Sequence, residues 1–472
     1  MLFQEPLPFI EEFVQELSDA IALRTSGKGL STDQHDWLSF CMMGIAVTNS
    51  INWTGFERAS LGAYKRNALS WMFCHSPMDW IELFHASLAV ILDEYGIKEG
   101  MLVLDDTDHQ RAKLTQEIYR AHKIFDKKTG GYFNGQCIVF LLLVTKEMTI
   151  PVGFAFHQPD PVIQAWNKED GRLRKAKVKK AQRPEMPARN PDFPTKKQLA
   201  IQLTKKFMET HPQVRVKGHL GDSWYSTAEY LDTVASLTSG QAVSQLKGNQ
   251  KILHPGKYES KEMSIEEYFQ RNPPTRNVLI IRGGKKQNVW FGGARLFVTS
   301  HGKKRLVIAL RYEGQEEYRY VVATDLSWRI LDVLQMWTLR WLVEVFIEDF
   351  KSYEGWGQLA KQPGEDGSCR GLTLSLLLDH CLLLHPSQKA RFESKQPAWT
   401  VGSLLRKIRM DALVAFIRPM MTDEEGDKKI EQLSQSIEKL FALRESSKHM
   451  SGRELGTQES SPSLLARHGR TG

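Results

Sequence analysis

Apolar residues recur at helical spacing through roughly the first hundred residues of the chain. The clearest segments are residues 9–23, 37–51 and 80–92. Residues three and four positions apart lie on one face of a helix, so each segment predicts an amphipathic helix. Ser31 or Thr32 is a plausible N-cap for the second one. We therefore predict a helical region over residues 1–98.

The pattern then changes to short apolar runs that alternate with helical segments. Strands are predicted at residues 101–104, 136–144, 150–157, 215–221 and 241–247. Helices are predicted at 197–209 and at 226–237, where a Ser-Thr-Ala-Glu capping box precedes the apolar positions. Three strands followed by alternating helices and strands are typical of a layered α/β domain.

A β-rich stretch and a long apolar helix follow. Further strands are expected at 278–282, 288–298, 305–311 and 318–323, which we interpret as an inserted β subdomain. Residues 328–352 predict one long buried helix that ends at Gly355. The expected order closes with apolar helices at 372–384 and 401–417, a charged helix at 423–444 and a disordered tail at 446–472.

Charge and cysteine content narrow the function classes. The net charge of +8 favours a polyanionic partner. Between Lys168 and Arg189, nine basic residues against three acids leave +6, a density that indicates phosphate binding. Five scattered cysteines without a CxxC pair favour reduced thiols in a cytosolic compartment and argue against structural zinc. No apolar run is long enough for a transmembrane span, and the acidic N-terminus is unlike a secretory signal.

Charged residues line up along the long predicted helix. Trp337, Arg340, Glu344, Glu348 and Lys351 recur at spacings of three, four and seven residues and so share one helical face. Charges on a buried helix must pair with each other or face a cleft, a metal or a charged ligand. The plainer alternative is an ion pair between Arg340 and Glu344 on a half-exposed helix, worth about 0.2–0.5 kcal/mol.

Acids also stand at the carboxyl ends of two predicted strands, where α/β sheets keep their sites. They are Asp106, within Asp105-Asp106-Thr107-Asp108, and Asp222. Together with Glu344 they form a carboxylate set that suits a hard cation, Mg²⁺ or Mn²⁺. Two such ions can stabilise the attacking and leaving oxygens of a phosphoryl transfer. Arg340 and Lys351 would then hold substrate phosphates.

The spacing aromatic-x2-Arg-x3-Glu-x6-Lys resembles the Y-R-E-K signature of DDE transposases of the insertion-sequence-four family. The strand end at Asp105-Asp106-Thr107, the turn Gly221-Asp222-Ser223-Trp224-Tyr225, the β insertion and the run at 354–363 are similar to that family. The resemblance covers roughly residues 99–390. Trp337 stands where the signature has tyrosine, which keeps an aromatic ring but loses a phenolic hydrogen bond.

The resemblance implies an RNase H-like fold and a Mg²⁺-dependent DNA transposase that cleaves at the ends of its element. It would then join the freed 3′-hydroxyl to target DNA. Asp106, Asp222 and Glu344 would bind two metal ions. Asp105 is the main rival for the first ligand, because the choice of Asp106 rests on its place before Thr107 in the family motif. Asp108 and Glu348 are lesser rivals.

Further DNA contacts are also implied by the resemblance. Arg340, Lys351 and Trp337 would lie near the cleaved end. Trp290 is the only tryptophan inside the insertion and is our candidate for stacking on a flipped base, with a core tryptophan as the alternative. Lys247 could reach the same DNA end. The histidines are left as structural or surface residues, since metal-activated water needs no further base.

The expected organisation has six parts. These are a helical DNA-binding region (1–98), a first part of the RNase H-like core (99–250) with the basic segment 158–196, an inserted β subdomain (251–323), a second core part with the catalytic helix (324–390), a C-terminal helical region (391–445) and a tail (446–472). We expect a cytoplasmic, nucleoid-associated homodimer on paired DNA ends, with no membrane and no small-molecule substrate. The alternatives are a repurposed non-catalytic DNA-binding protein and a structure-specific nuclease on the same fold. The complete triad argues against the first, and the β insertion argues against the second.

Overall fold

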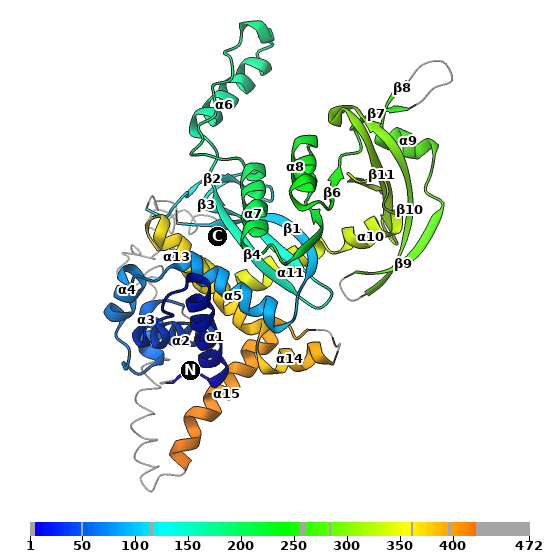
Figure 1. Cartoon of the computed structure of the whole chain (residues 1–472). Coiled ribbons are helices and arrows are strands. Elements are labelled where there is room, and N and C mark those ends of the chain that lie inside the picture. Colours follow the sequence, from blue (N-terminus) through cyan, green and yellow to red (C-terminus); the bar gives the residue numbers. More distant parts are fainter. Residues whose placement is uncertain are drawn as a thin grey trace, which may run out of the picture. The chain divides into compact units, whose positions relative to one another are not determined.

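The computed structural model describes residues 5–48, 51–112, 117–254, 261–282, 285–359, 362–394, 396 and 398–421 (Figure 1). The chain divides into one compact unit at Met1–Phe416 and a second unit at Ile417–Gly472. The account below concerns the first unit. The charged helix expected at 423–444 and the tail at 446–472 lie outside the described residues.

The N-terminal region is helical, as predicted. It contains α1 (Pro8–Thr25), α2 (Thr32–Val47), α3 (Trp53–Ala59), α4 (Arg66–His75) and α5 (Trp80–Glu94). Ser31 caps α2 in a capping box with Gln34. The sequence pattern missed α3, because residues 52–55 resemble a turn. Asn52 instead caps this helix by accepting a hydrogen bond from the Gly55 N–H at 2.8 Å.

The central sheet has the strand order β4-β3-β1-β5-β6. Its strands are β1 (Glu99–Gln110), β3 (Tyr132–Val144), β4 (Thr149–His157), β5 (Arg215–Leu220) and β6 (Gln241–Leu246), with the short β2 (His122–Phe125) paired to β3. Strands β1, β3 and β4 are antiparallel neighbours, whereas β5 lies parallel to β1 and β6 parallel to β5. This mixed sheet with flanking helices confirms the predicted RNase H-like α/β fold class.

The β-rich segment extends this sheet. Its strands are β7 (Lys251–His254), β8 (Lys261–Ser264), β9 (Arg276–Arg282), β10 (Lys285–Val298), β11 (Lys303–Tyr312) and β12 (Arg319–Ala323), with α9 (Ile265–Arg271) after β8. Strand β12 pairs with both β6 and β11, so the described strands join into one sheet of twelve. The extension continues the sheet on the side of β6 that is opposite β5 (Figure 1).

Helices cover both faces of the central sheet. The helices after the N-terminal region are α6 (Pro161–Lys175), α7 (Lys196–Thr210), α8 (Ala228–Thr238), α10 (Ile330–Thr338), α11 (Trp341–Tyr353), α12 (Trp356–Leu359), α13 (Gly364–Leu383), α14 (Pro386–Glu393) and α15 (Val401–Met421). One hydrophobic core joins Leu102 and Leu104 of β1 to α7 and α8. The other joins Val103 of β1 to α10 and α11. Among the described helices, none has the length and apolarity needed to cross a bilayer.

Three local predictions were wrong. Strand β1 continues through Asp105–Asp108, so these acids lie inside the strand and not after it. Helix α8 begins at Ala228, and Thr227 makes no side-chain capping bond, so the expected capping box is absent there. The long helix is interrupted between α10 and α11, where Leu339, Arg340, Leu342 and Val343 donate to carbonyls three residues back. Hydrogen bonds of this kind tighten the turn and separate the two helices.

Candidate active site

The two adjacent aspartates of β1 face opposite sides of the sheet. Side chains alternate along a strand, so Asp106 shares a face with Leu104 and Asp105 shares one with Val103. The contacts agree with this parity. Asp106 is ion-paired with Lys196 at the start of α7, whereas Asp105 is ion-paired with Arg340 at the start of α11. Only Asp105 therefore lies on the face that carries Glu344.

Arg340 is the centre of the cluster on the α11 face. Its Nη1 lies 3.2 Å from Oδ2 of Asp105, and its Nη2 forms an ion pair with Glu344 one turn along the helix. Its guanidinium carbon lies 5.7 Å from the centre of the Trp337 ring. Both Arg340 and Asp105 have side chains only 18% exposed, so solvent screens this pair weakly. Trp337 is buried, and its ring packs against the Arg340 guanidinium.

Asp222 completes the group from the end of β5. Its carboxylate accepts a hydrogen bond from the Trp224 N–H at 2.8 Å, and its backbone carbonyl accepts one from the Ser244 hydroxyl at 2.6 Å. These bonds fix the turn after β5. Beyond the effect of burial, the charge of Asp222 raises the pKa of Asp105. Likewise, beyond burial, the pKa of Asp222 is raised by the charge of Asp106 and lowered by that of Arg340. The predicted strand-end acid thus lies near both aspartates of β1.

The electrostatics of this cluster favour an added positive charge. Burial, helped by the charge of Asp222, raises the pKa of Asp105 to about 7 against the opposing effects of the Asp106 N–H and Arg340. Burial also raises the pKa of Asp222 above its usual range, and the charge of Asp106 adds to that effect. Asp105, Asp222 and Glu344 offer only carboxylate oxygens, the donors that a hard divalent cation prefers. The donor types of these side chains therefore suit Mg²⁺ or Mn²⁺, but their ligand atoms do not all lie within 4.8 Å of one another.

A second group lies on the α7 face. Ligand atoms of Asp106, Asp108 and Cys137 all lie within 4.8 Å of one another and could hold a metal ion. Asp106 also accepts a hydrogen bond from the Tyr225 hydroxyl at 3.4 Å and is neutralised by Lys196. Burial raises the pKa of the Cys137 thiol, which disfavours the thiolate that binds metals. The thiol suits a hard cation less well than a carboxylate would, but among the described residues this is the group whose ligand atoms lie close enough to hold a metal ion.

Sequence reasoning missed Lys196 and Tyr225. Both signals were present, since Lys196 follows the helix cap Thr195 and Tyr225 belongs to the turn that begins at Asp222. Nothing in the sequence, however, indicates which aspartate a lysine 90 positions away will contact.

The remaining predicted DNA contacts are dispersed. Lys351 Nζ donates to the backbone carbonyl of Asp108 at 2.9 Å and lies 5.3 Å from the centre of the Trp356 ring. Lys351 is therefore held beside the end of β1. Trp290 is half-buried in the β extension, where the Arg311 guanidinium lies 5.7 Å from its ring centre. Lys247 is exposed just after β6. Only Lys351 and the Arg340–Trp337 pair contact the elements that carry the acids.

The basic segment is partly helical. Its first half forms the end of α6, and its second half is extended, with a short 3-10 turn at Lys180–Gln182. Ion pairs of Arg172 with Glu169 and of Arg183 with Asp170 brace it. Most of its basic side chains are exposed. These exposed side chains are accessible to a polyanion such as a phosphate backbone, the partner that the charge density predicts.

Comparison with known families supports the same chemistry. Residues 30–263 match the model of a family described as "DDE superfamily endonuclease". No curated protein matches the chain. The matched region contains Asp105, Asp106 and Asp222 and ends before Glu344, so α11 lies outside it. Family match and fold together support a DDE-type transposase or endonuclease, an enzyme class that is typically dependent on divalent metal and acts on DNA. The group of Asp106, Asp108 and Cys137 could hold such a metal.

Proposed function

We propose that this protein is the transposase of an insertion sequence, which cleaves DNA at the ends of its element and joins the freed 3′-hydroxyl to target DNA. The observation that carries the proposal is the pairing of Arg340 with both Asp105 and Glu344, with Asp222 near enough for its charge to act on Asp105. These residues come from three elements that are far apart in the sequence. A purely structural ion pair would need only one of the acids.

We assign the metal-binding role to Asp105, Asp222 and Glu344, and a supporting role to Asp106. Bound divalent metal would activate a water or hydroxyl nucleophile and stabilise the leaving oxygen. The assignment of Asp105 departs from the family resemblance, which implied Asp106. It rests on the position of Asp105 on the α11 face, together with the pairing of Asp106 to Lys196 on the other face.

Arg340 would bind the DNA substrate. In the metal-free chain it neutralises Asp105 and Glu344. Once these carboxylates hold a cation, the guanidinium is released to bind a DNA phosphate with its planar array of donors. Trp337 keeps the guanidinium in place from the buried side. Lys351, beside the end of β1, would contact a second phosphate.

DNA ends would be held by the N-terminal helices and by the exposed basic segment at 168–189. Such a segment binds the phosphate backbone but carries no base code of its own. Base-specific contacts by Trp290 and Lys247, and a dimer on paired ends, remain part of the proposal.

The test is an end-cleavage and strand-transfer assay on DNA that carries the sequences flanking this reading frame, with Mg²⁺ or with EDTA. Asp105→Asn, Asp222→Asn and Glu344→Gln should each lower cleavage by about 100-fold or more, since even outer-shell changes at metal sites cost 10–100-fold. Glu348→Gln is the matched control, because Glu348 is exposed one turn further along α11. It should cleave like the wild type.

The aspartate pair is resolved by Asp106→Asn. This variant should retain more activity than Asp105→Asn, with DNA binding by both unchanged in a gel-shift assay. The reverse order would return the first ligand to Asp106. Cleavage without joined products would indicate a nuclease. DNA binding without any metal-dependent cleavage by the wild type would indicate a repurposed DNA-binding protein.

A further inference from the structure

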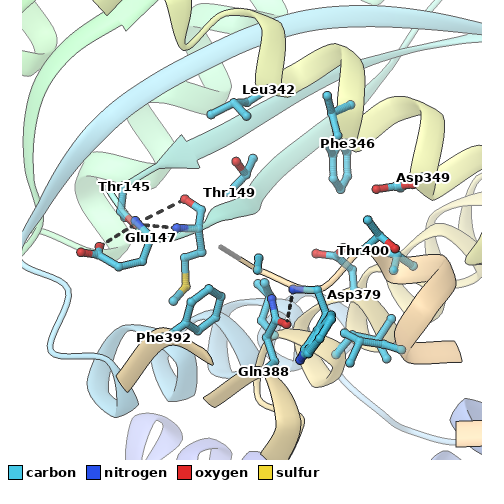
Figure 2. Close-up of a pocket in the computed structure, with 18 of the residues that line it drawn as sticks. Thr145, Glu147, Thr149, Leu342, Phe346, Asp349, Asp379, Gln388, Phe392 and Thr400 are labelled. Atoms are coloured by element: carbon cyan, nitrogen blue, oxygen red, sulfur yellow. Dashed lines mark hydrogen bonds between the residues drawn. The ribbon is translucent and has the colours of Figure 1, made fainter. Parts of the chain in front are cut away.

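A cavity lies behind the catalytic helix, on the side of α11 that faces away from Arg340 and Glu344. It has a volume of about 360 Å³ and is bounded by the β3–β4 turn, α11, α13 and α14, and by the start of α15 (Figure 2). Most of its wall is apolar, with Leu342 and Phe346 from α11 and Phe392 from α14 among the contributors. Trp399 also lines it, held by a hydrogen bond from its N–H to Gln388 at 2.9 Å.

Charged residues interrupt this apolar wall, namely Lys146 and Glu147 in the β3–β4 turn and two acids on the helices. Asp349 of α11 and Asp379 of α13 both line the cavity (Figure 2). The Asp379 side chain points into the cavity. Asp379 is only 7% exposed, yet its carboxyl oxygen Oδ2 has no hydrogen-bond partner. Glu354 is fully buried and interacts with Asp379. Neither of its carboxyl oxygens accepts a hydrogen bond from any other described group.

Lys146 of the β3–β4 turn is the one basic residue among the described residues that line the cavity, and its side chain is exposed. Among the described residues, no lysine, arginine or histidine forms an ion pair with Asp349, Glu354 or Asp379. Burial raises the pKa of Glu354 and of Asp379, because it disfavours the charged form of each carboxyl group. A buried, unpaired carboxylate is costly, and a cation that enters the cavity would relieve this cost.

We propose that this cavity binds a small alkylammonium ligand, such as a free aliphatic diamine. Its ammonium group would pair with Asp379 and Asp349, and its methylene chain would pack against Leu342, Phe346 and Phe392. An ammonium group supplies three donors for the unpaired carboxylate oxygens. The volume and the mainly apolar lining with a few converging polar groups are those of a small-molecule site.

The ligand would also act on the catalytic helix. Leu342, Phe346 and Asp349 lie on the same helix as Glu344 and within five residues of it. Occupancy would therefore restrain α11 near its start, close to the break that follows α10. The binding step itself does not depend on the proposed DNA chemistry, so it can be tested without an activity assay.

The experiment is titration calorimetry on the full chain freed of nucleic acid, with 1,5-diaminopentane as probe and 1,5-pentanediol as its uncharged match. The diamine should bind and the diol should bind at least about tenfold more weakly, because loss of a charge-assisted hydrogen bond costs that much. Asp379→Asn should weaken diamine binding by a similar factor. Asp366→Asn, at an exposed site on the same helix, should leave it unchanged.

Three results would overturn the proposal. These are no diamine binding at millimolar concentration, equal binding of diamine and diol, and unchanged affinity in Asp379→Asn. If Asp379→Asn fails to fold, Val345→Phe provides a second test. It narrows the cavity from a half-exposed position and keeps all the acids. This variant should also lose binding. Tighter binding of Nα-acetyl-lysinamide than of the diamine would reassign the site to a protein side chain and overturn the free-diamine proposal.

Discussion

At the scale of single residues, the site depends on which way neighbouring side chains point. Asp105 and Asp106 differ by one position, yet one meets Arg340 and the other meets Lys196. The sequence analysis preferred Asp106 because of its place before Thr107. The structure instead groups Asp105 with Arg340 and Glu344, and this difference leads to two measurable consequences.

The first consequence is a pH dependence of stability. The pKa of Asp105 is about 7 in the folded chain, well above its unfolded value, so the folded state binds more protons between about pH 4 and pH 7. The contribution of Asp105 to stability therefore falls as pH rises through this window. Asp105→Asn should gain stability relative to the wild type by up to about 1.4 kcal/mol per pH unit. Urea unfolding in EDTA at pH 5, 6 and 7 measures this, and a pH-independent difference would contradict it.

The second consequence concerns Lys196. Its side chain and that of Asp106 are 20% and 19% exposed, so their ion pair is largely shielded from solvent. Lys196→Met should lower the free energy of unfolding by about 1.5–3 kcal/mol, because it leaves a largely buried carboxylate without its cationic partner. Lys205→Met on the same helix removes an exposed pair with Glu209 and should cost under about 1 kcal/mol. Equal losses in the two variants would argue against a special role for Lys196.

At the scale of elements, α11 is defined by its two ends. It begins after a tightened turn at Leu339 and Arg340, and it ends at Tyr353, just before Gly355, the residue that the sequence predicted as the helix stop. Gly355 has a φ of +75°, a conformation that favours glycine. An added Cβ there would lie 2.6 Å from Cδ1 of Ile51. The end of the catalytic helix is thus fixed by backbone conformation and by close packing against the N-terminal region.

This makes Gly355→Ala a test of the helix end. The change should destabilise the chain by about 1–2 kcal/mol from backbone strain, with the contact to Ile51 adding to the loss. Gly171→Ala is the matched control, because Gly171 lies in α6 with open space around it. That change should stabilise the chain by about 0.5–1 kcal/mol. Thermal unfolding of both variants gives the comparison, and a neutral Gly355→Ala would refute the argument.

At the scale of the whole molecule, the layers around the sheet bury several histidines. Burial lowers the pKa of His219 to about 3 and the pKa values of His85, His157, His211 and His380 to about 4. These rings stay neutral in the folded chain. Some are well integrated, as His380 is through bonds to Ser87 at 2.7 Å and to the Pro151 carbonyl at 2.9 Å.

Acid should therefore destabilise the chain well above pH 4. The unfolded state binds protons at these histidines below about pH 6.5, whereas the folded state does not, so stability falls as pH drops from 6.5 towards 4. This trend opposes the one from Asp105 and from the other buried acids with raised pKa values, Asp222, Glu354 and Asp379, so a single histidine variant isolates it. His380→Gln should flatten the slope measured by chemical denaturation between pH 7 and pH 5. An unchanged slope would show that His380 is protonated while folded.

The sequence by itself determined the main helices and strands of the core, the fold class and the kinds of residue at the site. These follow from local periodicity, caps and turn residues, which act within a few positions of the chain. Strands β3, β4, β5 and β6 and the ends of α2 and α11 were thus predictable within a few residues.

Tertiary structure decided which of these residues meet. Both faces of β1 are covered by helices, so Leu102, Val103 and Leu104 are all buried and their pattern cannot tell which face α11 occupies. The choice between Asp105 and Asp106 depends on that face. The contact of Lys196 with Asp106 and the unpaired acids at the cavity likewise arise from segments brought together only by packing, and no local pattern encodes them.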